Sequence, residues 1–408
     1  MRGAQKRGVG AAAAGMLLGV HGLLPSAAPA QARDEGSWRR AGALAVGRYA
    51  PGAVLLPDGR ALVAGGYSFE TNRTHASSEI YDPVSAAWSL GPSLRLDRNF
   101  PLVFGQPDGD TLFAMGFQMR GGTSAWVLRF DSRRLRFVVS PNGVEERELA
   151  AAAPLSDGRV LIAGGYSTLR RRTLDTAEVY DPRSRRFSPL AAGLRHARFG
   201  HAAVSLADGR VLVVGGKVLE TNADVRIAEL FDPRSETFVE TGALSVGRDR
   251  VTAWTLAPVP GQGASVLIAG GSGATGGTTP ARRCEIYQAD TGQFVPGPEL
   301  VRDRMAHTAT LLDHRRVLLV GGWSTSENRT TPQAELWDPI QGRFLPAGSL
   351  EHGRHDHAAV RLREGRVLVA GGKEAPARSG IESPVPAEIW TPRGPARHLG
   401  DSTAPSAR

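Results

Sequence analysis

The chain is poor in cysteine, in aromatic residues and in long apolar runs. Its 408 residues include one cysteine, Cys284, which excludes an intramolecular disulfide framework and a zinc site built from several cysteines. Aromatic residues make up only 6%, yet the hydrophobic fraction of 41% suffices for a buried core and excludes a wholly disordered chain. Beyond the first residues no segment is apolar enough to cross a membrane, so we expect no membrane span.

The first 32 residues are typical of a secretory signal peptide. Arg2, Lys6 and Arg7 precede an apolar, small-residue run from Gly8 to Leu24, and Ala30-Gln31-Ala32 fits the A-x-A cleavage pattern. The alternative is a membrane anchor, but the run is short and only weakly apolar for a span. We therefore predict that residues 1–32 are removed and that the protein is secreted or periplasmic.

The formal net charge of +9 raises the question of nucleic acid. The arginines are dispersed along the chain and often lie near acidic residues, which favours a solvated basic surface over a nucleic-acid groove. An exported protein also rarely meets cytoplasmic nucleic acid. We expect no nucleic-acid partner.

The rest of the chain repeats one unit. The 50 glycines and 27 prolines follow no collagen-like period, so the glycines are expected in turns. A glycine pair after an apolar run recurs at Gly65-Gly66, Gly164-Gly165, Gly215-Gly216, Gly270-Gly271, Gly321-Gly322 and Gly371-Gly372, with Met115-Gly116 as a worn copy. The seven copies begin near residues 48, 98, 147, 198, 250, 304 and 354, about 50 residues apart.

Each copy predicts four short strands. After an opening arginine come two apolar runs, joined in four copies by an Asp-Gly or similar hairpin signal such as Asp58-Gly59 or Asp208-Gly209. A third run, such as "SSEIYDP" or "QAELWDP", follows a polar loop, and a further aromatic lies seven residues past the aromatic of that run, as in Tyr81 and Trp88. Four short strands cannot bury both faces alone, and radial packing of seven such sheets predicts an all-β, seven-bladed propeller.

The glycine pairs, the Tyr-Asp-Pro segments and the downstream aromatics closely resemble the kelch repeat family, over about residues 38–392. The seventh copy lacks its fourth-strand aromatic, whereas residues 38–44 match the corresponding strand of the fourth copy, with Trp38 standing for Phe238. We predict that this N-terminal strand completes the last blade. The propeller is expected over residues 33–397, with a flexible tail at 398–408.

Recurring cations are the first candidate site. The opening arginines would form a ring of guanidiniums that suits carboxylates, and in three copies a histidine follows at the third position. In the resembled family, the loops before the first strand and after the glycine pair share a face that often binds ligands. The alternative is structural hydrogen bonding between blades. The candidates are Arg48, Arg98, Arg198, Arg250, Arg304, Arg354, His201, His307 and His357.

The residue after each glycine pair varies between copies, which suits a specificity position. Aromatic side chains here could stack on sugar rings or grip a peptide, whereas the alternative is packing at the base of the loop. The candidates are Tyr67, Tyr166, Trp323, Lys217 and Lys373. By contrast, the glutamate two residues before the third-strand aromatic recurs in six copies, and we interpret it as structural, bonded to backbone or to arginine.

The function predicted first is a non-catalytic binding module for a protein or glycan ligand, acting as a monomer, with no metal and no cofactor. The alternative is a carbohydrate-active enzyme whose site lies on the same loop-bearing face, at the opening of the propeller axis. Resemblance offers two precedents: a sugar-acid mutarotase, and a copper radical oxidase of the galactose oxidase type. The oxidase needs two histidines, two tyrosines and a cysteine linked to a tyrosine, and Cys284 occupies a repeat-framework position instead.

Overall fold

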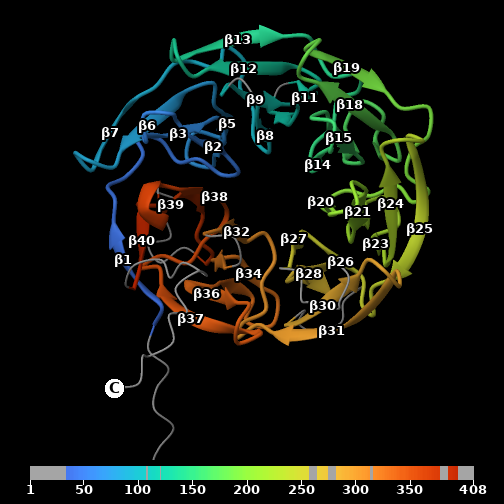
Figure 1. Ribbon diagram of the computed structural model, residues 1–408. Coiled ribbons are helices and arrows are strands. Elements are labelled where there is room, and N and C mark those ends of the chain that lie inside the picture. Colours follow the sequence, from blue (N-terminus) through green and yellow to red (C-terminus); the bar gives the residue numbers. More distant parts are fainter. Residues whose placement is uncertain are drawn as a thin grey trace, which may run out of the picture. The chain divides into compact units, whose positions relative to one another are not determined.

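Seven four-stranded antiparallel sheets, here called blades, form a ring (Figure 1). The structure, a computed structural model, describes residues 34–106, 109–119, 121–256, 264–273, 282–312, 316–376 and 385–393. Within this part of the chain one short 3-10 turn, Arg363–Gly365, is the only helical element, and no helix long and apolar enough to cross a membrane is found. The predicted all-β propeller is confirmed. The predicted signal peptide and C-terminal tail lie outside the described residues.

In each blade the strands follow one another from the axis outward, except that the last blade takes its outer strand from the N-terminus. Blade 1 consists of β2 (Gly52–Leu55), β3 (Ala61–Ala64), β6 (Ser78–Asp82) and β7 (Ala87–Leu90). Blade 2 consists of β8 (Leu102–Gly105), β9 (Thr111–Ala114), β12 (Val127–Asp131) and β13 (Arg136–Ser140). Blade 3 consists of β14 (Ala151–Pro154), β15 (Val160–Ala163), β18 (Ala177–Asp181) and β19 (Arg186–Pro189). Blade 4 consists of β20 (Ala202–Ser205), β21 (Val211–Val214), β24 (Ile227–Asp232) and β25 (Thr237–Ala243).

The other three blades continue the pattern. Blade 5 consists of β27 (Thr252–Thr255), β28 (Ser265–Ala269), β30 (Arg283–Gln288) and β31 (Gln293–Glu299). Blade 6 consists of β32 (Thr308–Leu311), β33 (Val317–Val320), β36 (Gln333–Asp338) and β37 (Arg343–Ser349). Blade 7 consists of β38 (His355–Arg361), β39 (Val367–Lys373), β40 (Glu388–Pro392) and β1 (Gly36–Arg40).

Between the second and third strands, short pairs form a crown of hairpins on one face of the ring. The pairs are β4 (Tyr67–Ser68) with β5 (Arg73–Thr74), β10 (Phe117–Gln118) with β11 (Gly122–Thr123), β16 (Tyr166–Ser167) with β17 (Arg172–Thr173), β22 (Lys217–Val218) with β23 (Ala223–Asp224), and β34 (Trp323–Ser324) with β35 (Arg329–Thr330). In blade 5, β29 (Ser272–Gly273) pairs instead with β26 (Arg248–Asp249). Neighbouring hairpins are joined by side-chain bonds such as Thr123 Oγ1 to Thr168 Oγ1 at 2.9 Å.

The core lies between the blades rather than inside each one. The second strands read as continuous apolar runs, such as Ala61–Ala64, because a neighbouring sheet covers each of their faces. One cluster joins Leu62 and Ile80 of blade 1 to Phe113 and Phe130 of blade 2, and another joins blade 7 to blade 1. No blade is therefore stable without its neighbours.

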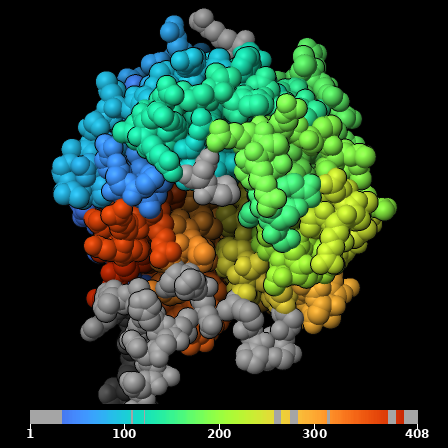
Figure 2. Space-filling model, turned by 45° about the horizontal axis from the view of Figure 1, so that its top comes forward, coloured from blue at the N-terminus to red at the C-terminus, as the bar shows by residue number. Residues whose placement is uncertain are grey.

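The predicted closure of the ring is confirmed. β1 pairs with β40 and sets Trp38 directly opposite Trp390, the same register as Tyr81 opposite Trp88 in blade 1. The strand covers 36–40 rather than the predicted 38–44, because Gly42 takes a left-handed φ of 74° and turns the chain away. The ring surrounds a hollow, with blade 7 in red beside blade 1 in blue (Figure 2).

Candidate functional site

The recurring opening arginines lie inside the blades. Arg48, Arg98, Arg147, Arg198, Arg304 and Arg354 are each at most 2% exposed. In blade 4, Arg198 Nη1 donates to the carbonyl of Gly215 at 3.0 Å, and Nη2 donates to Glu229 at 2.7 Å. These six guanidiniums are buried and bond to groups of their own blades, so they do not form a ring of cations exposed to a ligand. The buried pairs are Arg48–Glu79, Arg147–Glu178, Arg198–Glu229, Arg304–Glu335 and Arg354–Glu388.

The recurring glutamates tie the blades to their linkers, as predicted for a structural role. Besides its arginine, Glu229 accepts hydrogen bonds from the backbone N–H groups of Arg195 at 2.7 Å and His196 at 3.1 Å. Each opening arginine also uses its own carbonyl, which accepts from the second glycine of the preceding blade; Gly165 N to Arg198 O is 2.8 Å. A Cβ on Gly165 would approach Glu148 O to 2.9 Å, so this contact requires glycine.

Blade 5 needs a correction. The sequence pattern assigned Arg250 as its opening arginine, but Arg248 takes that role. Arg248 donates to Glu285 at 2.9 Å, as five of the other arginines donate to their glutamates, and its carbonyl accepts from Gly216, a contact that all seven share. The lengthened turn before β28 altered the spacing to the glycine pair and hid this equivalence. Arg250 is thereby free for a different task.

Blade 2 shows what happens when the glutamate is missing. Leu128 occupies that position, and Arg98 donates only through Nη1, to the carbonyls of Phe113, Met115 and Trp126. Its Nε and Nη2 are buried and have no hydrogen-bond partner among the described residues. Burial lowers the pKa of Arg98 to about 10.

The three predicted histidines are packed between blades. His201, His307 and His357 are 6–7% exposed, and each ring lies against the first glycine of the preceding blade. His307 Nε2 lies 2.8 Å from Thr252 Oγ1, and His357 Nε2 lies 2.8 Å from Thr308 Oγ1. Burial, followed by the charge of the neighbouring arginine, lowers the pKa of His201 and of His307 to about 3. These rings therefore pack between blades and are largely shielded from solvent.

Each blade has one buried arginine, with Arg248 in blade 5, which we call its framework arginine. The residues two positions after the framework arginines form a ring of backbone hydrogen bonds around the axis. At six of the seven junctions between blades, the N–H of one such residue donates to the carbonyl of its counterpart in the preceding blade, as in Phe100 N to Ala50 O at 2.9 Å. All seven residues have left-handed φ values, between 49° and 66°. We call them the axial ring: Ala50, Phe100, Leu149, Gly200, Arg250, Ala306 and Asp356.

A cavity of about 420 Å³, here called the mouth pocket, lies beside the axial ring on the face that bears the hairpins. Arg250 comes from the axial ring, Tyr49, Met305 and His355 from the position before it, and Trp323 and Lys373 from the position after the glycine pair. The two series lie together because Tyr49 bridges to Tyr67 and Met305 to Trp323, while His355 pairs with Lys373. The pocket is lined by Tyr49, Phe69, Arg250, Met305, Trp323, His355, Lys373 and Ala375.

Arg250 reaches across the axis. It forms an ion pair with Asp356 of blade 7, and its guanidinium carbon lies 5.5 Å from the ring centroid of Phe100 in blade 2. Asp356 also accepts a hydrogen bond from the Tyr49 hydroxyl at 2.7 Å. Burial by itself would raise the pKa of Asp356, but the charge of Arg250 and these hydrogen bonds hold it below its ordinary value. The cluster therefore carries a fixed ion pair at the floor of the mouth.

Glu148 adds a carboxyl group to the same face. It belongs to the series that precedes the axial ring, and its backbone bridges to Tyr166. Burial raises the pKa of Glu148 to about 7, against the opposing charge of Arg250. Its charge therefore changes near neutral pH, where most carboxylates stay ionised.

Three of the predicted site residues meet in the mouth pocket, namely Arg250, Trp323 and Lys373. Tyr67 stands behind it, with its ring 4.8 Å from that of Phe69. Tyr166 packs on Phe199 at 6.5 Å, and Lys217 bridges to Phe199, so these two lie outside the pocket lining. Sequence reasoning missed Tyr49, His355 and Asp356. Their signal was their variation among copies at positions one and two after the framework arginine.

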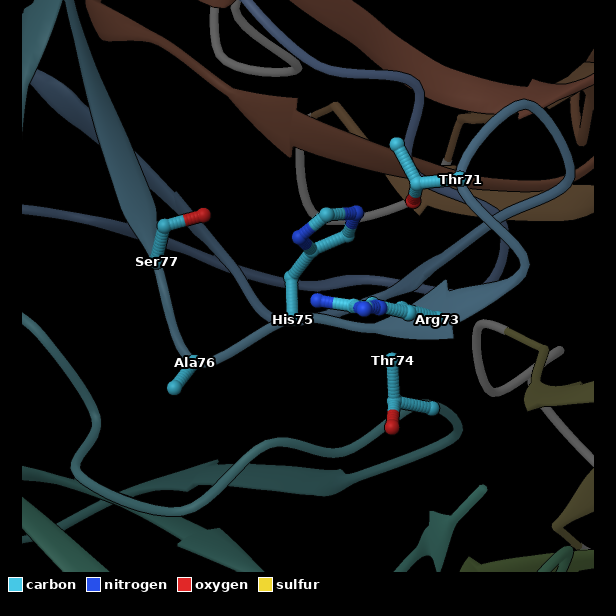
Figure 3. A pocket seen from close by; sticks show the side chains of 6 residues that line it. All are labelled: Thr71, Arg73, Thr74, His75, Ala76 and Ser77. Atoms are coloured by element: carbon cyan, nitrogen blue, oxygen red, sulfur yellow. The ribbon is translucent and has the colours of Figure 1, made fainter. Parts of the chain in front are cut away.

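A second cavity, of about 550 Å³, follows the hairpin of blade 1. Figure 3 shows its lining, which runs from Thr71 through His75 to Ser77. An equivalent cavity of about 490 Å³ lies in blade 4, where Asp224 to Ile227 take the places of Thr74 to Ser77. The cavity recurs at the same place in blades 1 and 4 with different side chains. It therefore follows from the shared backbone of the blades. None of the residues singled out in the sequence lines either cavity.

Comparison with known proteins supports the fold. The kelch motif is recognised at residues 150–192, which span blade 3. Among solved structures, a fungal alcohol oxidase of the AA5 family with catalytic diversity, in complex with copper, matches 88% of this chain and 77% of its own. The TM-score is 0.68 at 17% sequence identity, which supports a shared fold. No curated protein sequence matches the chain.

The residues that the structure describes do not fit a copper radical site. Cys284 is fully buried in the cluster between blades 5 and 6, with Leu267, Leu300 and Phe344 and without a tyrosine. Burial raises the pKa of the Cys284 thiol to about 12. The described lining of the mouth pocket offers one histidine and one tyrosine, and no three histidine, cysteine or acidic residues gather as a metal site in the described part of the chain.

Two observations now coincide. The motif recognised at 150–192 covers blade 3, and the other six blades repeat its four-stranded sheet. The seven copies close into one ring through β1 and β40. The recognised kelch motif and the ring of seven blades together support a kelch repeat propeller.

Proposed function

We propose that this propeller is an exported binding module whose mouth pocket takes an acidic glycan. The observation that carries the proposal is the chemistry of the lining. Three aromatic side chains, Tyr49, Phe69 and Trp323, stand beside the basic side chains Arg250 and Lys373, and the described lining contains no carboxylate. Aromatic faces suit the apolar face of a sugar ring, and cations suit an acidic substituent.

The aromatic side chains are held in place by one another. Tyr49 meets Phe69 edge-on with centroids 5.3 Å apart and meets Phe100 at 5.6 Å. Lys373 Nζ lies 3.8 Å from the centroid of Phe69, so its charge is held over the ring at the edge of the pocket. A ligand therefore meets a preformed surface and loses little affinity to ordering side chains.

A protein ligand is the second candidate, favoured by a different feature of the same face. The hairpins of blades 1 to 4 each expose a large apolar side chain, namely Phe69, Met119, Leu169 and Leu219, at 37%, 45%, 82% and 47%. Successive hairpins are joined by hydrogen bonds, for example from Leu219 N to Thr173 Oγ1 at 3.0 Å. Exposed apolar groups in a fixed arc are typical of a protein contact.

The test is a thermal-shift and calorimetric titration with polygalacturonate, alginate and a neutral glucan. A ligand at 100 times its Kd stabilises the protein by about 2.7 kcal/mol, so a bound polyanion gives a clear shift. Trp323→Ala and Lys373→Ala should each weaken binding. The matched control is Trp126→Ala, which removes a tryptophan that is 43% exposed and outside the pocket. Equal weakening in the control, or preference for the neutral glucan, would contradict the proposal.

Export is a separate part of the proposal, because residues 1–32 lie outside the described residues. N-terminal sequencing of the protein from the host's envelope or secreted fraction should begin at Arg33. A protein that still begins at Met1 would show that export by a cleaved signal does not occur.

A further inference from the structure

His355 is held by a buried carboxylate in a way that binding alone does not require. Its Nδ1 lies 2.7 Å from Asp356 Oδ2, and the Asp356 side chain is 7% exposed. Although burial opposes it, the pKa of Asp356 is held below its ordinary value by Arg250 and by its hydrogen bonds, so this group is a carboxylate at neutral pH. A carboxylate only accepts hydrogen bonds. His355 therefore donates from Nδ1, and a neutral ring presents a lone pair on Nε2.

The imidazole is also fixed in orientation. Its ring meets Tyr49 edge-on at 5.6 Å and Trp323 at 5.9 Å, and His355 lines the mouth pocket. Its Nδ1 is the hydrogen-bonded nitrogen, and no hydrogen bond of Nε2 is found among the described residues. A base oriented by a third group and open to a cavity is the arrangement of an activated proton acceptor.

Cations stand beside this base. His355 and Lys373 are directly opposite each other in the ladder between β38 and β39, so their side chains leave the sheet on the same face. Arg250 binds the other oxygen of the carboxylate that holds His355. If a ligand loses a proton from the carbon beside its own carboxylate, negative charge develops on that ligand carboxylate. Nearby cationic side chains stabilise this charge as it develops.

We propose that the mouth pocket catalyses β-elimination in a uronic-acid glycan, with His355 as the base. His355 Nε2 takes the proton from the ring carbon that bears the carboxylate. The electron pair of that C–H bond forms a double bond to the adjacent ring carbon, and the glycosidic C–O bond on that carbon breaks. The leaving oxygen takes a proton from water, and the imidazolium returns its proton to the hydroxide so formed. Two shorter chains result, one ending in an unsaturated uronate.

This inference rests on the proposed function and requires the same ligand in the same pocket. It adds a reaction that a binder lacks, with no oxidant, reductant or cofactor consumed. Tyr49, Trp323 and Phe69 would hold the sugar, whereas His355 would act on it. Binding and elimination are thus separable by mutation.

The experiment follows two signals with polygalacturonate and alginate: calorimetric binding, and the ultraviolet absorbance of the conjugated double bond. The wild type should give both. His355→Gln should bind within a few-fold of the wild type and lose elimination by at least about 100-fold, the usual share of a general base. The matched control is His196→Gln, which removes an imidazole from another histidine–carboxylate pair, His196–Glu240 in blade 4, outside the mouth pocket. It should keep both signals.

The outcomes separate the two proposals. A polyanion that binds the wild type without any elimination overturns the reaction and leaves the binding function standing. A protein to which neither polyanion binds overturns both. Elimination that survives in His355→Gln at an unchanged melting temperature, or that falls equally in His196→Gln, removes His355 as the base.

Discussion

Replacing Glu229 with leucine reproduces in blade 4 the arrangement that blade 2 has naturally. Glu229 is fully buried, binds Arg198 Nη2 at 2.7 Å and accepts two backbone N–H groups from the linker before the blade. Arg198 keeps its bonds to Gly215 O and Ile227 O in the variant, as Arg98 keeps its carbonyl partners beside Leu128. The variant thus removes the charge partner and leaves the backbone cradle intact.

The expected loss of stability follows from two opposing effects. Removing one partner of a buried ion pair costs about 3–5 kcal/mol, and each of the two stranded N–H donors adds about 1 kcal/mol where water cannot reach it. The buried leucine side chain returns roughly 2 kcal/mol. We expect Glu229→Leu to lower the free energy of unfolding by about 3–5 kcal/mol.

The assay is thermal and urea unfolding, with binding of the polyanion measured on the same samples at low temperature. The control is Glu240→Leu, which removes the exposed glutamate directly opposite Glu229 in the ladder and should change stability by less than about 1 kcal/mol. If Glu229→Leu unfolded at the wild-type midpoint but no longer bound ligand, the structural assignment of the arginines would be refuted.

The reciprocal substitution in blade 2 tests again whether the buried glutamate stabilises its arginine. Leu128→Glu offers a carboxylate to the unpartnered Nε and Nη2 of Arg98. The free energy of unfolding should rise only modestly, by about 1 kcal/mol, because the buried leucine side chain is lost. In addition, the N–H of Arg95, which corresponds to Arg195 in blade 4, already donates to Ser93 Oγ at 3.2 Å and does not need the new carboxylate. A fall in the unfolding midpoint as large as that of Glu229→Leu would contradict the pairing argument.

Two further predictions concern the closure of the ring by β1 and the stability of the protein at acidic pH. Deleting residues 34–40 removes β1 and exposes the edge of β40, so the melting temperature should fall sharply; an unchanged melting temperature would refute the closure. His307 has a folded-state pKa of about 3, whereas an unfolded chain takes up its proton near pH 6.5, so the folded state loses stability as pH falls through this window. Between pH 6.5 and 5, His307→Gln should lose less stability than the wild type, by up to about 1.4 kcal/mol per pH unit; parallel pH profiles for the two proteins would show that His307 titrates normally.

The fold could be predicted because the same sequence pattern recurs seven times along the chain. A glycine pair, a framework arginine and two aromatics seven residues apart define one sheet, and repetition makes an accidental match improbable. Even the closing strand could be predicted, from the match of Trp38 to Phe238, and the structure pairs Trp38 with Trp390. Only local detail was out of reach, such as the end of β1 at Arg40, which depends on the left-handed turn at Gly42.

The site could be predicted only in part, because repetition itself is misleading there. A residue that recurs serves a need that the blades share: Arg198 bonds within its own blade, and His307 packs against the preceding blade. A ligand breaks the symmetry, so its contacts lie where copies differ. Trp323 and Lys373 were found by that criterion, whereas His355 and Asp356 lie next to a recurring arginine and were overlooked.

The pairing of β1 with β40 also sets an order of events. The first strand of the propeller to be synthesised, Gly36–Arg40, has no partner until Glu388–Pro392 has been made, so it waits for nearly the whole chain. A chain that stops before residue 388 leaves both β1 and the outer side of β39 unpaired and prone to aggregation or proteolysis. The ring therefore closes only after the third strand of its last blade has been synthesised.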